Sequence, residues 1–125
     1  MRYSCGEWSL DLPEGWHAEV DDSCVTFCHT EDVGAFQVSS YRKDDVVTDA
    51  DLKEFAGDIP LAAVSLAGFT GFRTRFSEGD TFWTRWWLRS GCQMIFATYN
   101  CDLADRGRED EAVAMMLDSL RPVTV

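Results

Sequence analysis

Three long segments between residues 69 and 100 are separated only by short turn sequences. The segments are FTGFRTRFS (69–77), TFWTRWWLRS (81–90) and CQMIFATYN (92–100), and the turns are Glu78-Gly79-Asp80 and Ser90-Gly91. β-Strands joined by so few residues pair as antiparallel neighbours, because a parallel connection needs a crossover of a dozen residues or more. These residues therefore predict a three-stranded antiparallel unit.

Four shorter segments precede this unit. WSLDL (8–12) alternates apolar and polar residues, which is the period of a half-buried strand. Turn residues at 13–15, 21–23 and 30–34 then separate the segments WHAEV (16–20), CVTFCH (24–29) and AFQVSSY (35–41). We expect the four segments to form an antiparallel meander.

Two segments have helical periodicity instead. In TDADLKEFAGDI the apolar residues fall at i, i+3, i+4 and i+7, Thr48 or Asp49 can cap the first turn, and Gly57 or Pro60 can end the helix. We expect this helix at about residues 49–58, followed by a short strand near 63–66. REDEAVAMMLDSL predicts a second amphipathic helix at about 108–120, closed by Pro122 before a final strand at 123–125.

The order of these elements is strands, helix, strands, helix, which is typical of an α+β fold. The 125 residues are 46% hydrophobic, which is enough to bury the core of one domain. We therefore expect a single α+β domain over residues 1–125. Its sheet should be largely antiparallel, with about six to eight strands and the two main helices packed on it.

The charge balance limits the partners. With 11 basic and 22 acidic residues the net charge is −11, and nucleic acids and anionic lipid surfaces need a basic footprint instead. No apolar run is long enough for a secretory signal or a membrane span, so we expect a cytoplasmic protein that contacts neither membrane nor nucleic acid. Solvation explains most of the acidic surface, and a basic protein partner is the functional alternative.

The residues that could carry chemistry do not form a recognised motif. Cys24 and Cys28 would lie about 13 Å apart on a strand, at roughly 3.3 Å per residue, which is too far for a disulfide or a shared metal ion. His29 follows Cys28 directly and would point to the opposite face. The sequence has no nucleophile elbow, phosphate-binding loop, dinucleotide-binding motif or calcium loop. We expect no catalytic residue, metal or cofactor, and lean toward a non-enzymatic protein.

The turn lengths of the three-stranded unit predict which side chains share a face. A two-residue turn at Ser90-Gly91 would place Trp86 opposite Ile95, and a three-residue turn at 78–80 would place Phe72 opposite Trp86. The core face would then contain Phe72, Phe76, Phe82, Trp86, Leu88, Ile95, Ala97 and Tyr99. The other face would contain Arg73, Arg75, Trp83, Arg85, Trp87, Arg89, Met94 and Phe96.

The second face is the candidate binding surface. It gathers four of the eleven basic residues among aromatic rings, and a guanidinium over a tryptophan ring is stabilised by about 0.5–2 kcal/mol. Trp and Arg are also enriched at binding hot spots. The structural alternative, which we favour, is that the acidic helix covers this face and its carboxylates meet the arginines. The candidate binding residues are Arg73, Arg75, Trp83, Arg85, Trp87, Arg89 and Phe96.

Two stretches resemble a known fold family. SLDLPEGW near the start resembles the entry of the PsbP-like (Mog-type) α/β/α fold, and EDEAVAMMLDSLRPV resembles its closing helix. The WWL strand and the TYN segment are similar to those of small bacterial proteins of that superfamily. The resemblance implies this architecture. It also implies a binding role, because the superfamily is mostly non-enzymatic and includes a photosystem subunit and a nuclear-transport factor that both dock to other proteins.

Two functions follow from these expectations. The first is a non-enzymatic, cytoplasmic protein-binding module of the adaptor or immunity type, which uses the Arg/Trp sheet face or the acidic surface. The alternative is a small-ligand-binding protein or minor enzyme with a pocket lined by Trp83, Trp87, Arg85 and Tyr99. The sequence leaves open the partner's identity and the choice between monomer and homodimer.

Overall fold

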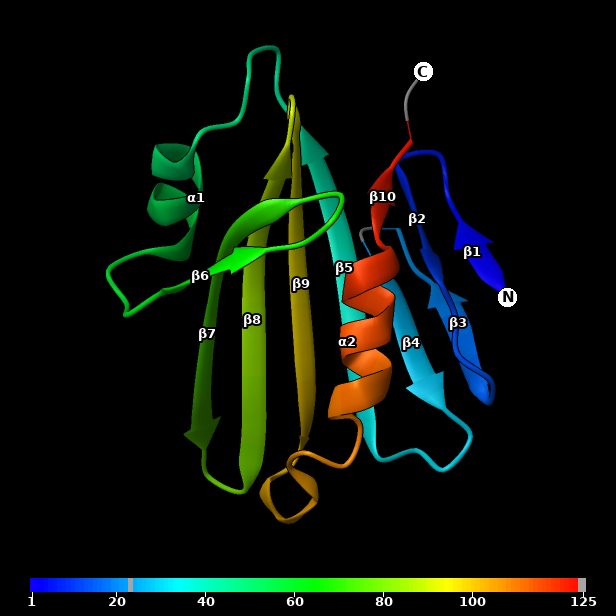
Figure 1. Ribbon diagram of the computed structural model, residues 1–125. Coiled ribbons are helices and arrows are strands. Elements are labelled where there is room, and N and C mark those ends of the chain that lie inside the picture. Colours follow the sequence, from blue (N-terminus) through cyan, green and yellow to red (C-terminus); the bar gives the residue numbers. More distant parts are fainter. Residues whose placement is uncertain (23, 124–125) are drawn as a thin grey trace.

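The computed structural model describes residues 1–22 and 24–123, whose strands form two sheets (Figure 1). The elements are β1 (Arg2–Ser4), β2 (Trp8–Asp11), β3 (Trp16–Val20), β4 (Val25–His29), β5 (Gly34–Arg42), α1 (Asp49–Ala56), β6 (Ala62–Ser65), β7 (Thr70–Glu78), β8 (Thr81–Ser90), β9 (Gln93–Asp102), a short 3-10 turn (Leu103–Asp105), α2 (Asp110–Ser119) and β10 (Arg121–Pro122). The main sheet has the order β3-β4-β5-β9-β8-β7-β6, and the small sheet has the order β1-β2-β10.

The predicted fold class is confirmed. The described residues form a single α+β domain in which neighbouring strands pair antiparallel, with two α-helices. The main sheet has seven strands, within the range predicted for the sheet. The small sheet was not predicted, because we expected β2 to be the first strand of the meander. In the structure β2 pairs with β1 and β10, so the meander contains only β3, β4 and β5.

The helices begin and end close to their predicted bounds. Thr48 caps α1 with a capping box in which its side chain accepts from the Asp51 N–H, and Gly57 ends the helix with a φ of 85°. α2 is followed at once by β10, at 121–122. The predicted last strand, 123–125, is therefore shifted, and its residues 124–125 lie outside the described residues. Ser23, the end of one predicted turn, also lies outside them.

The turns on either side of β8 contain two residues each, Gly79-Asp80 and Gly91-Cys92. In both turns the glycine comes first and has a positive φ, 60° at Gly79 and 58° at Gly91. This is the pattern of a type II′ hairpin turn, whose twist matches that of the flanking strands. The predicted three-residue turn at 78–80 and the predicted turn at Ser90-Gly91 are therefore wrong.

The first of these errors exchanges the two faces of β7. Phe72 pairs with Trp87, and Arg73 pairs with Trp86, which is a shift of one residue from the prediction. A one-residue shift moves every side chain of a strand to the other face. Arg73 and Arg75 therefore leave the Trp83 face, and Phe72 and Phe76 join it. The β8–β9 register is shifted by two residues, which leaves the faces of both strands as predicted.

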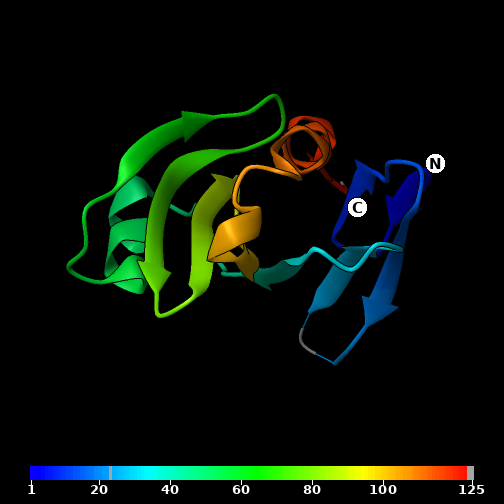
Figure 2. The same cartoon turned by 90° about the horizontal axis from the view of Figure 1, so that it is seen from below.

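The larger core lies on the face of the main sheet that α2 and the small sheet cover (Figure 2). Trp86, Leu88 and Ile95 contribute from β8 and β9, and Met116 contributes from α2. The β6–β7 hairpin folds over the same face toward α2 (Figure 1). A Cβ added at Gly68, near the tip of this hairpin, would collide with the carbonyl oxygen of Leu120.

A second core lies under α1 on the opposite face. It contains Val47, Leu52 and Trp87, and the partly buried side chains packed against it are Ala56, Leu61, Phe72, Met94 and Phe96. Leu52 is fully buried, and Phe55 contacts both Phe96 and Tyr41 through tilted ring pairs. α1 has eight residues and contacts β7 and β8, so it covers one end of this face and leaves the rest open.

We expect Leu52→Ala to lower the free energy of unfolding by about 2–5 kcal/mol, because it opens a cavity between α1 and the sheet. Asp49→Ala removes only an exposed ion pair with Arg89 and should cost less than about 1 kcal/mol. Urea unfolding followed by tryptophan fluorescence measures both. A loss for Leu52→Ala as small as that for Asp49→Ala would contradict the packing of α1 on the sheet.

Candidate functional site

The predicted binding residues separate into three places. Trp87, Arg89 and Phe96 lie at the end of the sheet that α1 covers. Trp83 and Arg85 lie on the same face beyond the helix, beside Phe76. The remaining two, Arg73 and Arg75, lie on the opposite face, toward α2.

The expectation that an acidic helix covers the Arg/Trp face is correct for the first place. Trp87 is 3% exposed and packs against Leu52 of α1. The Arg89 Nε donates to Asp49 Oδ1 at 2.7 Å, so the first turn of the helix neutralises this arginine. Trp87 and Arg89 are consequently part of the helix–sheet contact and are poorly placed to meet a partner.

The second place is a stack of Phe76, Trp83 and Arg85, which we call the Arg/Trp patch. The Phe76 and Trp83 rings are 7° from parallel with centroids 6.3 Å apart. The Arg85 Cζ lies over both rings, 4.8 Å from the Phe76 centroid and 5.2 Å from the Trp83 centroid. Arg85 forms no ion pair with a described carboxylate, and its buried Nε has no hydrogen-bond partner among the described residues.

The side chains of the sheet around the Arg/Trp patch are polar and small. Gln37 donates to the Thr26 hydroxyl and accepts from the Thr98 hydroxyl, linking β4, β5 and β9 on this face. An antiparallel sheet commonly presents such a face to water. Trp83 and Arg85, which are half-buried, are larger than these neighbouring polar side chains.

The third place is a groove of about 270 Å³ on the opposite face, which we call the arginine groove. Arg73 and Arg75 are alternate residues of β7 and form one wall, and α2 forms the other. Burial, and next the charge of the neighbouring Arg75, lower the pKa of Arg73. Because alternate residues of a strand share a face, the two guanidiniums lie on the same side of the sheet. Neither forms an ion pair with a carboxylate of residues 1–22 or 24–123.

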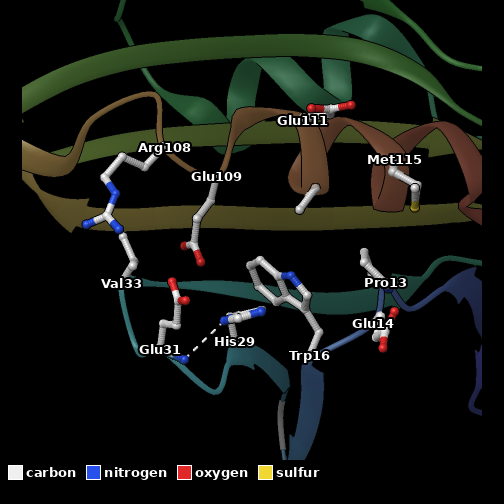
Figure 3. Close-up of a pocket in the computed structure, with 11 residues that line it drawn as sticks. Pro13, Glu14, Trp16, His29, Glu31, Val33, Arg108, Glu109, Glu111 and Met115 are labelled. Carbon is white, nitrogen blue, oxygen red and sulfur yellow. Dashed lines mark hydrogen bonds between the residues drawn. The ribbon is translucent and has the colours of Figure 1, made fainter.

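A fourth feature, the acidic pocket, was not predicted (Figure 3). This hollow of about 360 Å³ lies between the start of α2 and the loops around Gly15 and Glu31. The Glu31 and Glu109 carboxylates point into it, close to the Trp16 indole (Figure 3). His29 contributes its ring, but its Nδ1 accepts the Glu31 N–H at 3.0 Å, so this nitrogen is already engaged. Arg108 also lines the hollow, but its guanidinium is paired with Asp105 at 3.0 Å, so the carboxylates and the indole suit an added cation.

Tyr99 connects the arginine groove to the acidic pocket. Its ring lines the groove, and its hydroxyl donates to Glu109 Oε1 at 2.7 Å. Burial, and next the hydrogen bond to Glu109, raise the pKa of Tyr99 well above its usual range. Tyr99 therefore stays protonated at neutral pH and keeps donating to the carboxylate of Glu109, a residue that is 9% exposed.

The pocket predicted for a small ligand does not form. Tyr99 pairs with Thr84, whereas Trp83 pairs with Asn100, so Tyr99 lies on the face opposite Trp83, Arg85 and Trp87. Successive residues of a strand point to opposite faces, and no change of side-chain rotamer brings these four residues together. The two faces of the sheet have to be considered separately.

The thiols and acidic residues offer no metal centre in the part of the chain that the structure describes. All five cysteines are free, and no group of three or more His, Cys, Asp or Glu side chains is arranged to hold an ion there. Burial first, and nearby carboxylates next, raise the pKa of Cys28. Burial also raises the pKa of Cys101. These two thiols are therefore protonated at neutral pH and are weak nucleophiles.

The sequence contained a signal for the correct turns. A glycine followed by another residue is the usual pair in a two-residue type II′ turn, and both Gly79-Asp80 and Gly91-Cys92 fit it. Placing glycine first at both turns would have put Arg73 and Arg75 on the α2 face. The acidic pocket had no comparable signal, because Trp16, Glu31 and Glu109 come from three distant segments.

Comparison with known proteins shows similarity in structure. The sequence matches no protein-family model and no curated protein. A crystal structure of a protein from Bacteroides thetaiotaomicron has a TM-score of 0.74 at 16% identity and covers 98% of this chain and 48% of its own. A crystal structure of LpqN, involved in cell envelope biogenesis of Mycobacterium tuberculosis, has a TM-score of 0.60 at 12% identity. The similarity covers 94% of this chain and 83% of LpqN.

These similarities show the fold alone. This chain spans about half the length of the Bacteroides protein. No helix among the described residues is long and apolar enough to cross a bilayer.

We expect Tyr99→Phe to lower the free energy of unfolding by about 1–3 kcal/mol, because the buried Glu109 carboxylate loses its hydrogen-bond donor. In a Glu109→Gln background, where no buried charge remains, the same change should cost clearly less. Urea unfolding of the four proteins gives the coupling between the two side chains. Equal costs in the two backgrounds would show that the hydroxyl does not stabilise the carboxylate.

Proposed function

We propose that this protein is a non-enzymatic protein-binding module that docks a partner on the Arg/Trp patch. The supporting observation is Arg85, which lies over two aromatic rings without a carboxylate partner on a sheet face that α1 leaves open. In a chain of net charge −11, an arginine without an ion pair is available to an acidic group of another protein. Arg and Trp together are enriched at binding hot spots.

The physical argument for the patch is preorganisation. The aromatic pair fixes the plane of the guanidinium, so a partner carboxylate that binds it does not have to order a mobile side chain. A carboxylate also fits the planar fork of an arginine in a bidentate arrangement. Partner binding would bury the half-exposed Trp83 ring beside this ion pair and exclude water from it.

The acidic surface is the second docking surface, and the acidic pocket is where it is concave. Glu14, Glu31 and Glu109 line this pocket with Trp16, an arrangement that suits a lysine or arginine side chain of a basic partner. The two surfaces lie on different parts of the molecule and are separable by substitution. A cytoplasmic location, a PsbP-like relationship and the choice between monomer and homodimer stay predictions from the sequence.

The experiment is capture of partners from native lysate on immobilised protein. We expect Arg85→Gln combined with Trp83→Ala to reduce recovery of a specific partner at least tenfold, since loss of a hot spot of about 2 kcal/mol corresponds to roughly 30-fold in affinity. Glu31→Gln, in the acidic pocket, is the matched control and should retain the partner. All variants are first compared by near-ultraviolet circular dichroism to confirm native packing.

Two results would contradict the proposal. Equal capture by the folded Arg85→Gln, Trp83→Ala variant would remove the Arg/Trp patch as the docking surface. Loss of the partner on Glu31→Gln alone would instead assign docking to the acidic pocket and a basic partner.

A further inference from the structure

The arginine groove is bounded by four parts of the fold. Its floor is made by alternate residues of the central strands, Thr84 and Trp86 of β8 and Tyr99 of β9. The β6–β7 hairpin closes one side of the groove with Val64 and Leu66, and its loop lies against Leu120, the residue after α2. One stripe of α2 forms the facing wall, at the spacing i, i+3, i+4, i+7 and i+8, with the residues Asp110, Val113, Ala114, Leu117 and Asp118.

Opposite charges face each other across this groove without meeting. Arg73 and Arg75 lie on the β7 wall, and Asp110 and Asp118 lie at the two ends of the α2 stripe. None of these four side chains forms an ion pair within the described residues. These four charges therefore have no ionic partner among the described residues and are available to a ligand in the groove.

A threonine hydroxyl lies on the floor between the charged walls. Thr84 is 3% exposed, and its side chain forms no hydrogen bond with another described residue. It belongs to the cross-strand row Arg75, Thr84, Tyr99. The hydroxyl oxygen is not fully shielded from solvent, so it opens onto the hollow, where a ligand can form a hydrogen bond with it.

The rest of the lining is apolar and limits the size of a ligand. Trp86, Val113 and Leu117 belong to the larger core and present their surfaces to the groove. The volume of about 270 Å³ lies just below the range of about 300–1,000 Å³ typical of ligand pockets. A ligand of this size has one apolar side chain and a few polar atoms.

We propose that the arginine groove binds a free α-amino acid with an apolar side chain. The ligand carboxylate would lie between Arg73, Arg75 and the Thr84 hydroxyl, its ammonium group would face an aspartate of α2, and its side chain would contact Trp86 and Leu117. A zwitterion matches the charges of both walls at once. An anion without the ammonium group would meet the α2 carboxylates unpaired, and a cation without the carboxylate would meet the two arginines unpaired.

The test is a titration of the purified protein with L-leucine, L-methionine and L-phenylalanine, followed by amide resonances in two-dimensional NMR. We expect millimolar amino acid to shift resonances of β7, β8 and α2 around the groove. N-acetyl-L-phenylalanine, which lacks the ammonium group, and L-phenylalaninamide, which lacks the carboxylate, should each bind at least tenfold more weakly than L-phenylalanine.

Variants identify the groups that make the contacts. Arg75→Gln should weaken L-phenylalanine and N-acetyl-L-phenylalanine, but not L-phenylalaninamide, because the amide has no carboxylate to lose. Thr84→Val, of nearly the same shape, should weaken the carboxylate-bearing ligands in the same way. Arg85→Gln lies on the other face of the sheet and should leave amino-acid binding unchanged. Because Arg85→Gln removes only the docking surface proposed above, the two proposals fail separately.

The proposal is overturned if none of the three amino acids shifts resonances around the groove of the folded protein. Equal affinities for L-phenylalanine and its two blocked forms would also overturn it, because apolar contact alone would then explain binding. Unchanged binding by Arg75→Gln, with native near-ultraviolet circular dichroism, would place the ligand elsewhere.

Discussion

The register of β7 against β8 is the constraint on which both proposed surfaces depend. Two residues, Gly79 and Asp80, connect these strands, and the glycine supplies the positive φ that the tight turn requires. This pairing places Phe76 beside Trp83 on one face, and Arg73 and Arg75 on the other. One additional residue in the turn would exchange these faces and dissolve both the aromatic stack and the arginine groove.

The two helices then determine which parts of the sheet stay open. α2 and the small sheet cover one face, but the helix is displaced from β7, and the hairpin of β6 and β7 folds toward it to leave a groove. On the other face α1 is only eight residues long and covers the end around Trp87. The open areas are therefore where Arg73, Arg75 and Arg85 lie, on the two faces of the sheet.

Periodicity and turn residues predicted the fold class, both helices and nearly all strands, because these features depend on local sequence. Thr48 and Gly57 mark the ends of α1 through interactions within a few residues. The small sheet could not be predicted this way, because β2 and β10 lie far apart in the sequence. The face of Arg73 and Arg75 was predicted wrongly because it depends on one residue of turn length, which alternation alone does not determine.

The most direct test of this account is the pattern of nuclear Overhauser effects between the backbones of β7 and β8. The structure predicts cross-strand contacts that join Arg73 with Trp86 and Arg75 with Thr84, consistent with a two-residue turn at Gly79-Asp80. Contacts that join Phe72 with Trp86 instead would contradict it. They would return the two arginines to the Trp83 face and remove the physical basis of both proposed surfaces.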